Sequence, residues 1–232
     1  MRYLKTDRLY CFSPLVMITT FIIEIACAIY VLFRYKLNPI SRLAVAVLVG
    51  LAVFQLAEFN VCTTPWGIDS LTWARIGYVA ITALPPLGIH LAARIAKKKI
   101  PWLVVAGYAS GAIFASIFLF AGSGMTGQQC LGNYVIFQIA HWAVWPYAVY
   151  YYGWLLATVG LSLYWARSAK KNLRAALTLL AVGYAAFIVP TTFVNIVDPS
   201  TIAGIPSIMC GFAVILALVL TGLVLPRRAL VK

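Results

Sequence analysis

Long apolar runs separated by short polar links dominate the chain. Most runs are near or above the roughly 20 residues that a helix needs to cross about 30 Å of hydrocarbon. Charge, proline or glycine bounds each of them, as is usual at helix ends. The pattern predicts seven membrane-spanning helices, over about residues 12–33, 44–61, 71–95, 101–122, 136–166, 173–197 and 202–225.

This pattern predicts an all-α integral membrane protein, a seven-transmembrane helix bundle forming one domain over residues 1–232. The strands of a transmembrane β-barrel would appear as segments of about ten residues with alternating polarity. The runs in this chain are longer and uniformly apolar, so a barrel is not expected. The first run is too long for the 7–15 residue core of a signal peptide and contains Glu24, so we expect a true span there. The fifth run is the longest, and its first turns are expected in the interface or in a separate short helix.

The composition agrees with a membrane protein and disfavours a soluble enzyme. Of the 232 residues, 63% are hydrophobic and 10% charged, whereas soluble domains have about 45–50% and about 25%. No HExxH, GxSxG or P-loop motif occurs, so we expect no catalytic residues and no enzyme activity. The two histidines, His90 and His141, lie at opposite predicted depths, so no shared metal or haem is expected, and no cofactor. The seventh run has no lysine for a retinal Schiff base.

In a soluble protein, a net charge of +13 would indicate nucleic-acid binding. Here the distribution of the basic residues along the chain indicates how the protein is oriented in the membrane. Fourteen of the 18 basic residues follow the first, third, fifth and seventh runs, and the other four are Arg2, Lys5, Arg8 and Arg75. The positive-inside rule places the larger set in the cytoplasm. We therefore expect a multi-pass protein of the plasma membrane, with an outer N-terminus and a cytoplasmic C-terminus. Its expected partner is the lipid bilayer, whose anionic headgroups attract the basic links, and not nucleic acid.

Three cysteines lie at predicted outer positions, namely Cys11, Cys62 and Cys130. A disulfide between Cys62 and Cys130 would join the second outer turn to the third in an oxidising compartment. Small buried thiols are the alternative, and the sequence leaves both open.

Polar residues within spans are costly, so each is a candidate for function. Gln55 and Glu58 lie three apart on one face of the second span, and Arg75 enters the third span at a similar predicted depth. Glu58 and Arg75 are predicted either to form an ion pair that fixes packing or to be half of a pocket for a charged or zwitterionic ligand. Glu24, near mid-membrane, is a protonated core carboxyl or a member of a proton relay.

The fifth span is unusually aromatic. Gln138, His141 and Trp145 share roughly one face, which fits either interfacial anchors or the wall of a ligand pocket. Tyr78 of the third span and Asn195 of the sixth are expected to add to such a pocket from the outer ends of their helices.

Several short motifs carry a resemblance to a known family. They are Trp73-Ala-Arg75-Ile-Gly-Tyr78, Leu84-Pro85-Pro86-Leu87, Asp198-Pro199-Ser200-Thr201 and Leu225-Pro226-Arg227-Arg228, with Arg174 and Pro190 in the sixth span. In these the chain resembles the N-terminal seven-transmembrane sensor region of bacterial histidine kinases. The resemblance implies a bundle whose outer half senses a ligand and whose last helix passes the signal inward. Family members usually continue into a cytoplasmic output domain, whereas seven residues follow Leu225 here, so a separate signalling partner is expected.

The leading interpretation is a non-enzymatic membrane receptor or sensor. It would bind a small-molecule or lipid ligand in its outer half and signal to a cytoplasmic or membrane partner. A small transporter or channel is the second interpretation, with Glu24 and Glu58 as proton carriers, although no internal repeat supports it. An accessory subunit of a larger membrane complex is the third.

Overall fold

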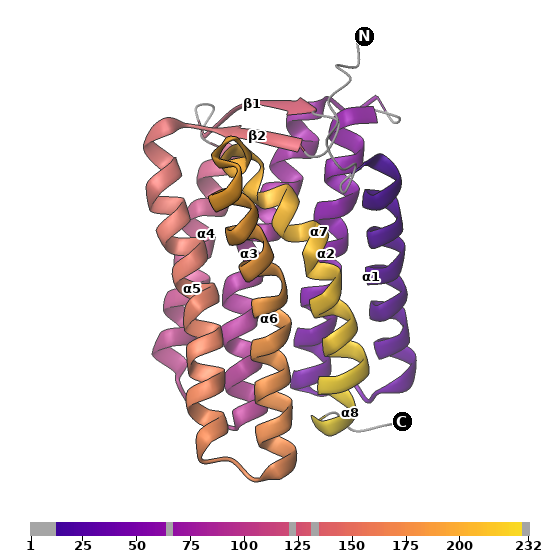
Figure 1. The fold of residues 1–232 in the computed structure, drawn as a ribbon, viewed down its shortest axis with the longest axis vertical. Coiled ribbons are helices and arrows are strands. Elements are labelled where there is room, and N and C mark those ends of the chain that lie inside the picture. Colours follow the sequence, from indigo (N-terminus) through magenta and orange to yellow (C-terminus); the bar gives the residue numbers. More distant parts are fainter. Residues whose placement is uncertain (1–12, 64–66, 121–123, 131–134, 229–232) are drawn as a thin grey trace.

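The computed structural model describes residues 13–63, 67–120, 124–130 and 135–228. Within these ranges seven long helices form one bundle, with a two-stranded hairpin across one end (Figure 1). The long helices are α1 (Pro14–Arg34), α2 (Pro39–Thr63), α3 (Ser70–Ala96), α4 (Pro101–Phe120), α5 (His141–Arg167), α6 (Lys171–Val197) and α7 (Ile205–Val219). The shorter elements are the strands β1 (Met125–Cys130) and β2 (Val135–Ile139), the 3-10 helix η1 (Pro199–Gly204), the π-helical turn η2 (Leu220–Val224) and the terminal turn α8 (Leu225–Arg228).

Proline and polar caps fix where several helices begin. Pro14, Pro39 and Pro101 are the first helical residues of α1, α2 and α4, positions where a missing N–H costs nothing and the fixed φ suits a helix. Before α2, the Asn38 side chain accepts hydrogen bonds from two backbone N–H groups of the first turn, at 2.9 and 3.0 Å. These signals explain why the apolar runs start as helices at these residues.

The ends of α3 are fixed by Asp69 and Lys97. The Asp69 carboxylate accepts hydrogen bonds from the Thr72 hydroxyl at 2.7 Å and from the Thr72 backbone N–H at 2.9 Å. These two bonds hold the pKa of Asp69 below its usual range, because they favour the ionised form. Lys97 closes the helix in the left-handed conformation, with φ of 56°.

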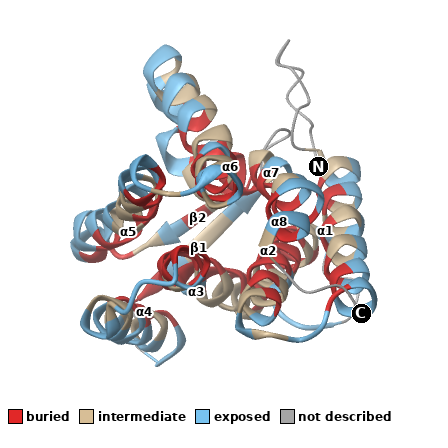
Figure 2. Cartoon of the chain, turned by 90° about the horizontal axis from the view of Figure 1, so that it is seen from below, coloured by how far each residue is buried: buried red, intermediate tan, exposed pale blue. Residues whose placement is uncertain are grey.

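The core lies around α2, α3 and α7, whose inward faces are the most buried (Figure 2). Helix α3 packs against α2, α4, α5 and α6, whereas α4 packs chiefly on α3. Gly77 of α3 lies against Phe54 and Ala57 of α2. This contact fixes which face of α2 turns toward α3.

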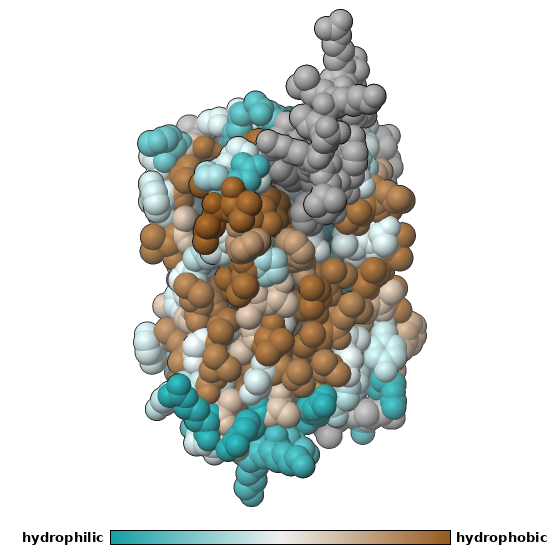
Figure 3. All heavy atoms as spheres, viewed as in Figure 1, coloured by the Kyte–Doolittle hydropathy of each residue, from teal (hydrophilic) through white to brown (hydrophobic). Residues whose placement is uncertain are grey.

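Six segments of the described chain are long and apolar enough to cross a membrane: α1, α2, α3, α4, α6 and the continuous run Pro199–Arg228. Their number confirms the prediction of a multi-pass membrane protein. An apolar band covers the middle of the face seen in Figure 3, and hydrophilic residues gather at its lower end, where the basic link between α5 and α6 lies. Each predicted span corresponds to one helix or helical run, apart from the first residues of the fifth; residues 12, 121 and 122 lie outside the described residues.

One predicted boundary is wrong. Residues 136–139, expected as the first turns of the fifth span, belong to strand β2, and α5 begins only at His141. β2 pairs antiparallel with β1, with Cys130 opposite Val135 and Gly127 opposite Gln138. The β-branched Val135, Ile136 and Ile139 favour an extended backbone, so this apolar segment covers the end of the bundle instead of prolonging a helix.

Candidate functional site

A cavity of about 390 Å³ lies beneath the hairpin, between β2, α3, α5 and the η1–α7 segment. Its volume falls within the range of small-molecule sites, about 300–1,000 Å³. None of the described residues that line it is charged or a histidine, and the described walls are mostly apolar and aromatic. The lining residues are Tyr78, Ile81, Ile136, Phe137, Gln138, Ile139, Val144, Tyr147, Ala148, Tyr151, Tyr152, Ile202, Ala203, Ile205 and Pro206.

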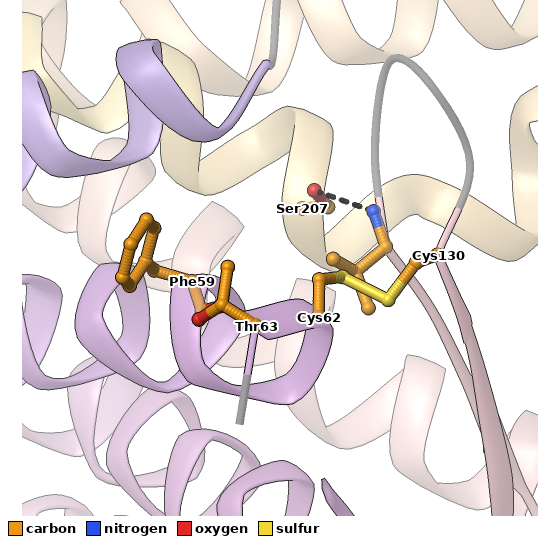
Figure 4. Close-up of a disulfide and its surroundings, with 6 residues drawn as sticks. Phe59, Cys62, Thr63, Cys130 and Ser207 are labelled. Atoms are coloured by element: carbon orange, nitrogen blue, oxygen red, sulfur yellow. Dashed lines mark hydrogen bonds between the residues drawn. A yellow bond between two sulfur atoms is a disulfide. The ribbon is translucent and has the colours of Figure 1, made fainter. Parts of the chain in front are cut away.

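The hairpin forms one wall of the cavity and is anchored covalently. A disulfide joins Cys130 at the end of β1 to Cys62 at the end of α2, with the two Cα atoms 5.8 Å apart (Figure 4). On β2, the Phe137 ring packs against Phe54 and Tyr78, with centroids 5.6 and 5.3 Å apart. The Cys62–Cys130 pairing considered from the sequence is the one present in the structure.

A hydrogen bond joins the hairpin to α7 as well. The Val135 backbone N–H donates to the Ser207 hydroxyl oxygen at 3.2 Å (Figure 4). Ser207 follows Ile205 and Pro206, which line the cavity. The hairpin is thus fixed to α2 by a disulfide and to α7 by a hydrogen bond. These two links hold it in place as the roof of the cavity.

The aromatic wall comes from the inward face of α5. Tyr147 lies with its ring 5.6 Å from that of Tyr78, and its hydroxyl is 3.0 Å from the Thr82 hydroxyl. Tyr150 donates a hydrogen bond of 2.6 Å to the Thr82 backbone oxygen. Tyr147 and Tyr151 line the cavity and are buried, and the hydrogen bond of the neighbouring Tyr150 holds this part of α5 against α3.

The structure brings two of the predicted site residues, Tyr78 and Gln138, to the cavity. They arrive from different elements, since Tyr78 lies on α3 and Gln138 on β2. Gln138 therefore reaches the cavity from a strand and not from the helical face on which the sequence placed it.

The predicted ion pair between Glu58 and Arg75 is absent from the described structure. Glu58 is buried, with Oε1 lacking a hydrogen-bond partner among the described residues, and Nε of half-buried Arg75 also lacks one. The reason is helix rotation: α2 turns Phe54 and Ala57 toward α3, and Glu58 lies on the neighbouring face. Glu58 and Arg75 are not among the cavity residues either.

Three other predicted residues also lie away from the cavity. His141 and Trp145 are exposed on α5, Trp145 by 76%, while the inward face of that helix carries the tyrosines. Asn195 of α6 accepts a hydrogen bond from the Thr201 hydroxyl at 2.7 Å and thereby ties α6 to η1. We assign no ligand contact to these three residues.

Gln55 and Glu58 are buried on α2 away from the cavity, and Glu24 is buried on α1. Helices α1, α2 and α7 pack together, and Glu24 has neither carboxylate oxygen paired within the described chain. Gln55 lies one turn from Glu58 on α2 and is 1% exposed. The predicted polar residues are thus divided between the cavity and these buried positions.

The wall formed by β2 and by Ile202, Ala203, Ile205 and Pro206 was not predicted from the sequence. A signal for the strand is present, because Val-Ile-Phe-Gln-Ile at 135–139 is rich in β-branched residues and follows Gly132 and Asn133. Nothing comparable marks 202–206, whose place at the cavity depends on how α7 packs.

Comparison of the chain with protein-family models, with curated proteins and with solved structures finds no match. The function proposed below therefore depends on the geometry of the site and on the pattern of the sequence.

Proposed function

We propose that this protein is a non-enzymatic seven-helix membrane receptor that binds a small lipophilic ligand beneath its hairpin. The observation that carries the proposal is the half-open cavity of about 390 Å³, which a disulfide-anchored roof and a wall of buried tyrosines border. A few polar groups in a mostly apolar cavity are typical of sites that orient a small molecule.

The lining selects an uncharged ligand. A charged molecule would lose its hydration without gaining an opposite charge, since the described cavity residues include no acid, base or histidine. Aromatic rings such as those of Tyr78 and Tyr147 favour flat or ring-containing molecules. We propose that one polar group of such a ligand hydrogen-bonds to a tyrosine hydroxyl of the lining or to the amide of the exposed Gln138.

The receptor is proposed to signal along its last helical run. Ile202 to Pro206 line the cavity, and the run continues through the π-helical turn η2 to α8 at the opposite end (Figure 1). There the Arg228 guanidinium donates a hydrogen bond of 3.0 Å to the Ile95 backbone oxygen of α3. A ligand that shifts η1 and the start of α7 would thereby move α8 at the basic end of the bundle. A separate partner would detect this movement, as the resemblance to sensor regions implies.

We further propose that α5 is the seventh span and that the hairpin end faces outside. At 27 residues, α5 measures about 40 Å at 1.5 Å per residue, and its many tryptophans and tyrosines explain its lower hydropathy. The basic links after α1, α3 and α5 support this orientation. Lys98→Cys and Gln128→Cys, each combined with Cys11→Ser, test it. In intact cells an impermeant thiol reagent should label only the Gln128→Cys variant, and labelling of the Lys98→Cys variant alone would reverse the orientation.

Photolabelling tests the ligand cavity directly. The probe is a neutral trifluoromethyl-phenyl-diazirine, which partitions into membranes and reacts with adjacent side chains. In the purified full chain we expect labelling of Tyr147 and Tyr151 that an excess of unlabelled probe suppresses. Ala148→Trp should abolish this saturable labelling, because Ala148 lines the cavity and the indole would fill it.

Val149→Trp is the matched control, since Val149 neighbours Ala148 on α5 but is 70% exposed. It should leave the saturable labelling unchanged. Labelling confined to outward residues, or equally saturable in Ala148→Trp, would contradict a ligand cavity at this place.

A further inference from the structure

The cavity beneath the hairpin opens to the side of the bundle, and residues of its lining mark the opening. Val144 of α5 is 40% exposed and Ile202 of η1 is 57% exposed, although both line the cavity. Ala203 of η1 also lines the cavity and is exposed. Because these side chains reach both the cavity and the outer surface, the opening lies between α5 and η1.

The packing of the elements agrees with an opening at this place. Helix α5 packs on α3 and α6, and η1 packs on α6 and β2, whereas in the described chain α5 and η1 are not packed closely on each other. Strand β2 continues through Ala140 into α5 and borders the opening at the hairpin end (Figure 1). The side of the bundle between α5 and η1 is thus left without a covering element.

The rim of the opening on α5 lies at the depth of acyl chains. Val144, Ala148 and Tyr152 line the cavity at a spacing of four residues, which places them on one face of the helix. They lie within about 16 Å of the start of α5, at 1.5 Å per residue. The exposed Trp142 and Trp145 in the first turns indicate the level of the lipid headgroups. In the orientation proposed above, the opening therefore faces the outer leaflet of the membrane.

Two tyrosine hydroxyls inside the cavity have no hydrogen-bond partner among the described residues. They belong to Tyr78 and Tyr151, which line the cavity and are only 3% and 7% exposed. The neighbouring Tyr147 differs, because its hydroxyl lies 3.0 Å from the Thr82 hydroxyl. Buried polar groups are rarely left unsatisfied, so Tyr78 and Tyr151 gain most from a ligand that accepts their hydrogen bonds.

Gln138, at the hairpin end of the lining, offers less to a ligand. Its side chain is exposed, so water can hydrogen-bond to the amide when no ligand is present. A ligand group at Gln138 would only exchange one hydrogen bond for another, whereas a group at the buried tyrosines satisfies hydroxyls that otherwise lack a protein partner. The polar part of the ligand therefore belongs at the inner end of the cavity, and the apolar part belongs at the opening.

We propose that the ligand is a neutral lipid of the outer leaflet, whose ring and hydrogen-bond acceptor bind at Tyr78 and Tyr151 and whose apolar tail leaves between α5 and η1. This inference rests on the proposed function and adds the class and the orientation of the ligand. A volume of about 390 Å³ is at the lower end of the range for small-molecule sites. It suits the ring of such a lipid, while the opening lets the tail remain among the acyl chains.

Two photoreactive esters of dodecyl benzoate test the orientation, with the full chain in phosphatidylcholine nanodiscs. One ester carries a trifluoromethyl-diazirine on the ring, and the other carries a diazirine in the middle of the chain. The first should label Tyr78 or Tyr151 and the second Val144, Ile202 or Ala203. Excess unlabelled dodecyl benzoate should suppress both. Labelling in the reverse order, with the ring at the opening and the chain at the tyrosines, would overturn the proposal.

Variants test the two hydroxyls. Tyr78→Phe and Tyr151→Phe should each raise the concentration of dodecyl benzoate needed for suppression by about 2- to 10-fold, which corresponds to one hydrogen bond. Tyr164→Phe is the control, because Tyr164 is also on α5 but is 65% exposed and does not line the cavity; it should leave that concentration unchanged. The same concentration for all three variants would overturn the assignment. If a variant does not fold, the order of labelling in the unmodified chain still decides.

The small trifluoromethyl-phenyl-diazirine separates this inference from the receptor proposal. Saturable labelling by the small probe that dodecyl benzoate does not suppress would overturn the lipid inference and leave the ligand cavity in place. If the small probe itself gives no saturable labelling, the cavity does not bind ligands and both proposals fail.

Discussion

Ser207 joins three features of the molecule through one hydroxyl group. Its oxygen accepts the Val135 N–H from the hairpin and lies within reach of the Glu58 carboxylate. The two residues before it, Ile205 and Pro206, line the cavity. Ser207 thus lies where the hairpin and the start of α7 meet, next to residues that line the cavity.

Close packing of α3 depends on individual glycines. A Cβ at Gly88 would lie 2.2 Å from Tyr184 Oη and 2.9 Å from Tyr184 Cζ, and the Tyr184 ring is buried in α6. At Gly153 and Gly160 of α5, a Cβ would have no neighbour within 4 Å. Glycine is therefore required at position 88, whereas a larger residue fits at positions 153 and 160.

Gly88→Ala should lower the free energy of unfolding by about 1–3 kcal/mol, because overpacking forces apart α3 and α6. Gly153→Ala should be neutral or stabilising by up to about 1 kcal/mol, since alanine is the better helix former. Denaturant unfolding of both variants in the same detergent measures the difference. A Gly88→Ala variant as stable as Gly153→Ala would contradict the close approach at this point.

At the scale of elements, the hairpin shows what the sequence could and could not predict. The apolar runs predict the helices well, because a helix satisfies all the backbone hydrogen bonds of a long hydrophobic segment in a bilayer. They do not predict helix rotation. An ion pair between Glu58 and Arg75 was one of two alternatives for these residues, and it is absent from the described structure, in which α2 turns Phe54 and Ala57 toward α3. The strand β2 was not predicted, because a five-residue apolar strand directly before an apolar helix cannot be told from the first turns of that helix by its pattern alone.

The Cys62–Cys130 disulfide should stabilise the hairpin and the cavity beneath it. Loop closure across 68 residues contributes at most about 4 kcal/mol. We expect the Cys62→Ser/Cys130→Ser variant to have a lower Tm and weaker saturable photolabelling than the unmodified chain. Reductant should lower the Tm of the unmodified chain but not that of the variant.

Cys27→Ser is the control, since Cys27 is a free, half-buried cysteine of α1. It should keep the Tm of the unmodified chain and its sensitivity to reductant. An unmodified chain whose Tm does not respond to reductant would show that the disulfide contributes nothing to stability.

The whole molecule has two different ends joined by one bundle. The hairpin and the cavity lie at one end, and the basic links that follow α1, α3 and α5 lie at the other. The run from η1 to α8 extends from the first end to the second. This polarity was predictable from the charges, whereas the site was not, because its walls come from elements far apart in the sequence.

Mass spectrometry of molecules that co-purify with the protein from its native membranes tests the central claim most directly. We expect one neutral, ring-containing lipophilic molecule per unmodified chain. The molecule should be lost from Ala148→Trp and retained by Val149→Trp. The same neutral molecules in equal amounts on all three proteins would contradict a ligand site beneath the hairpin.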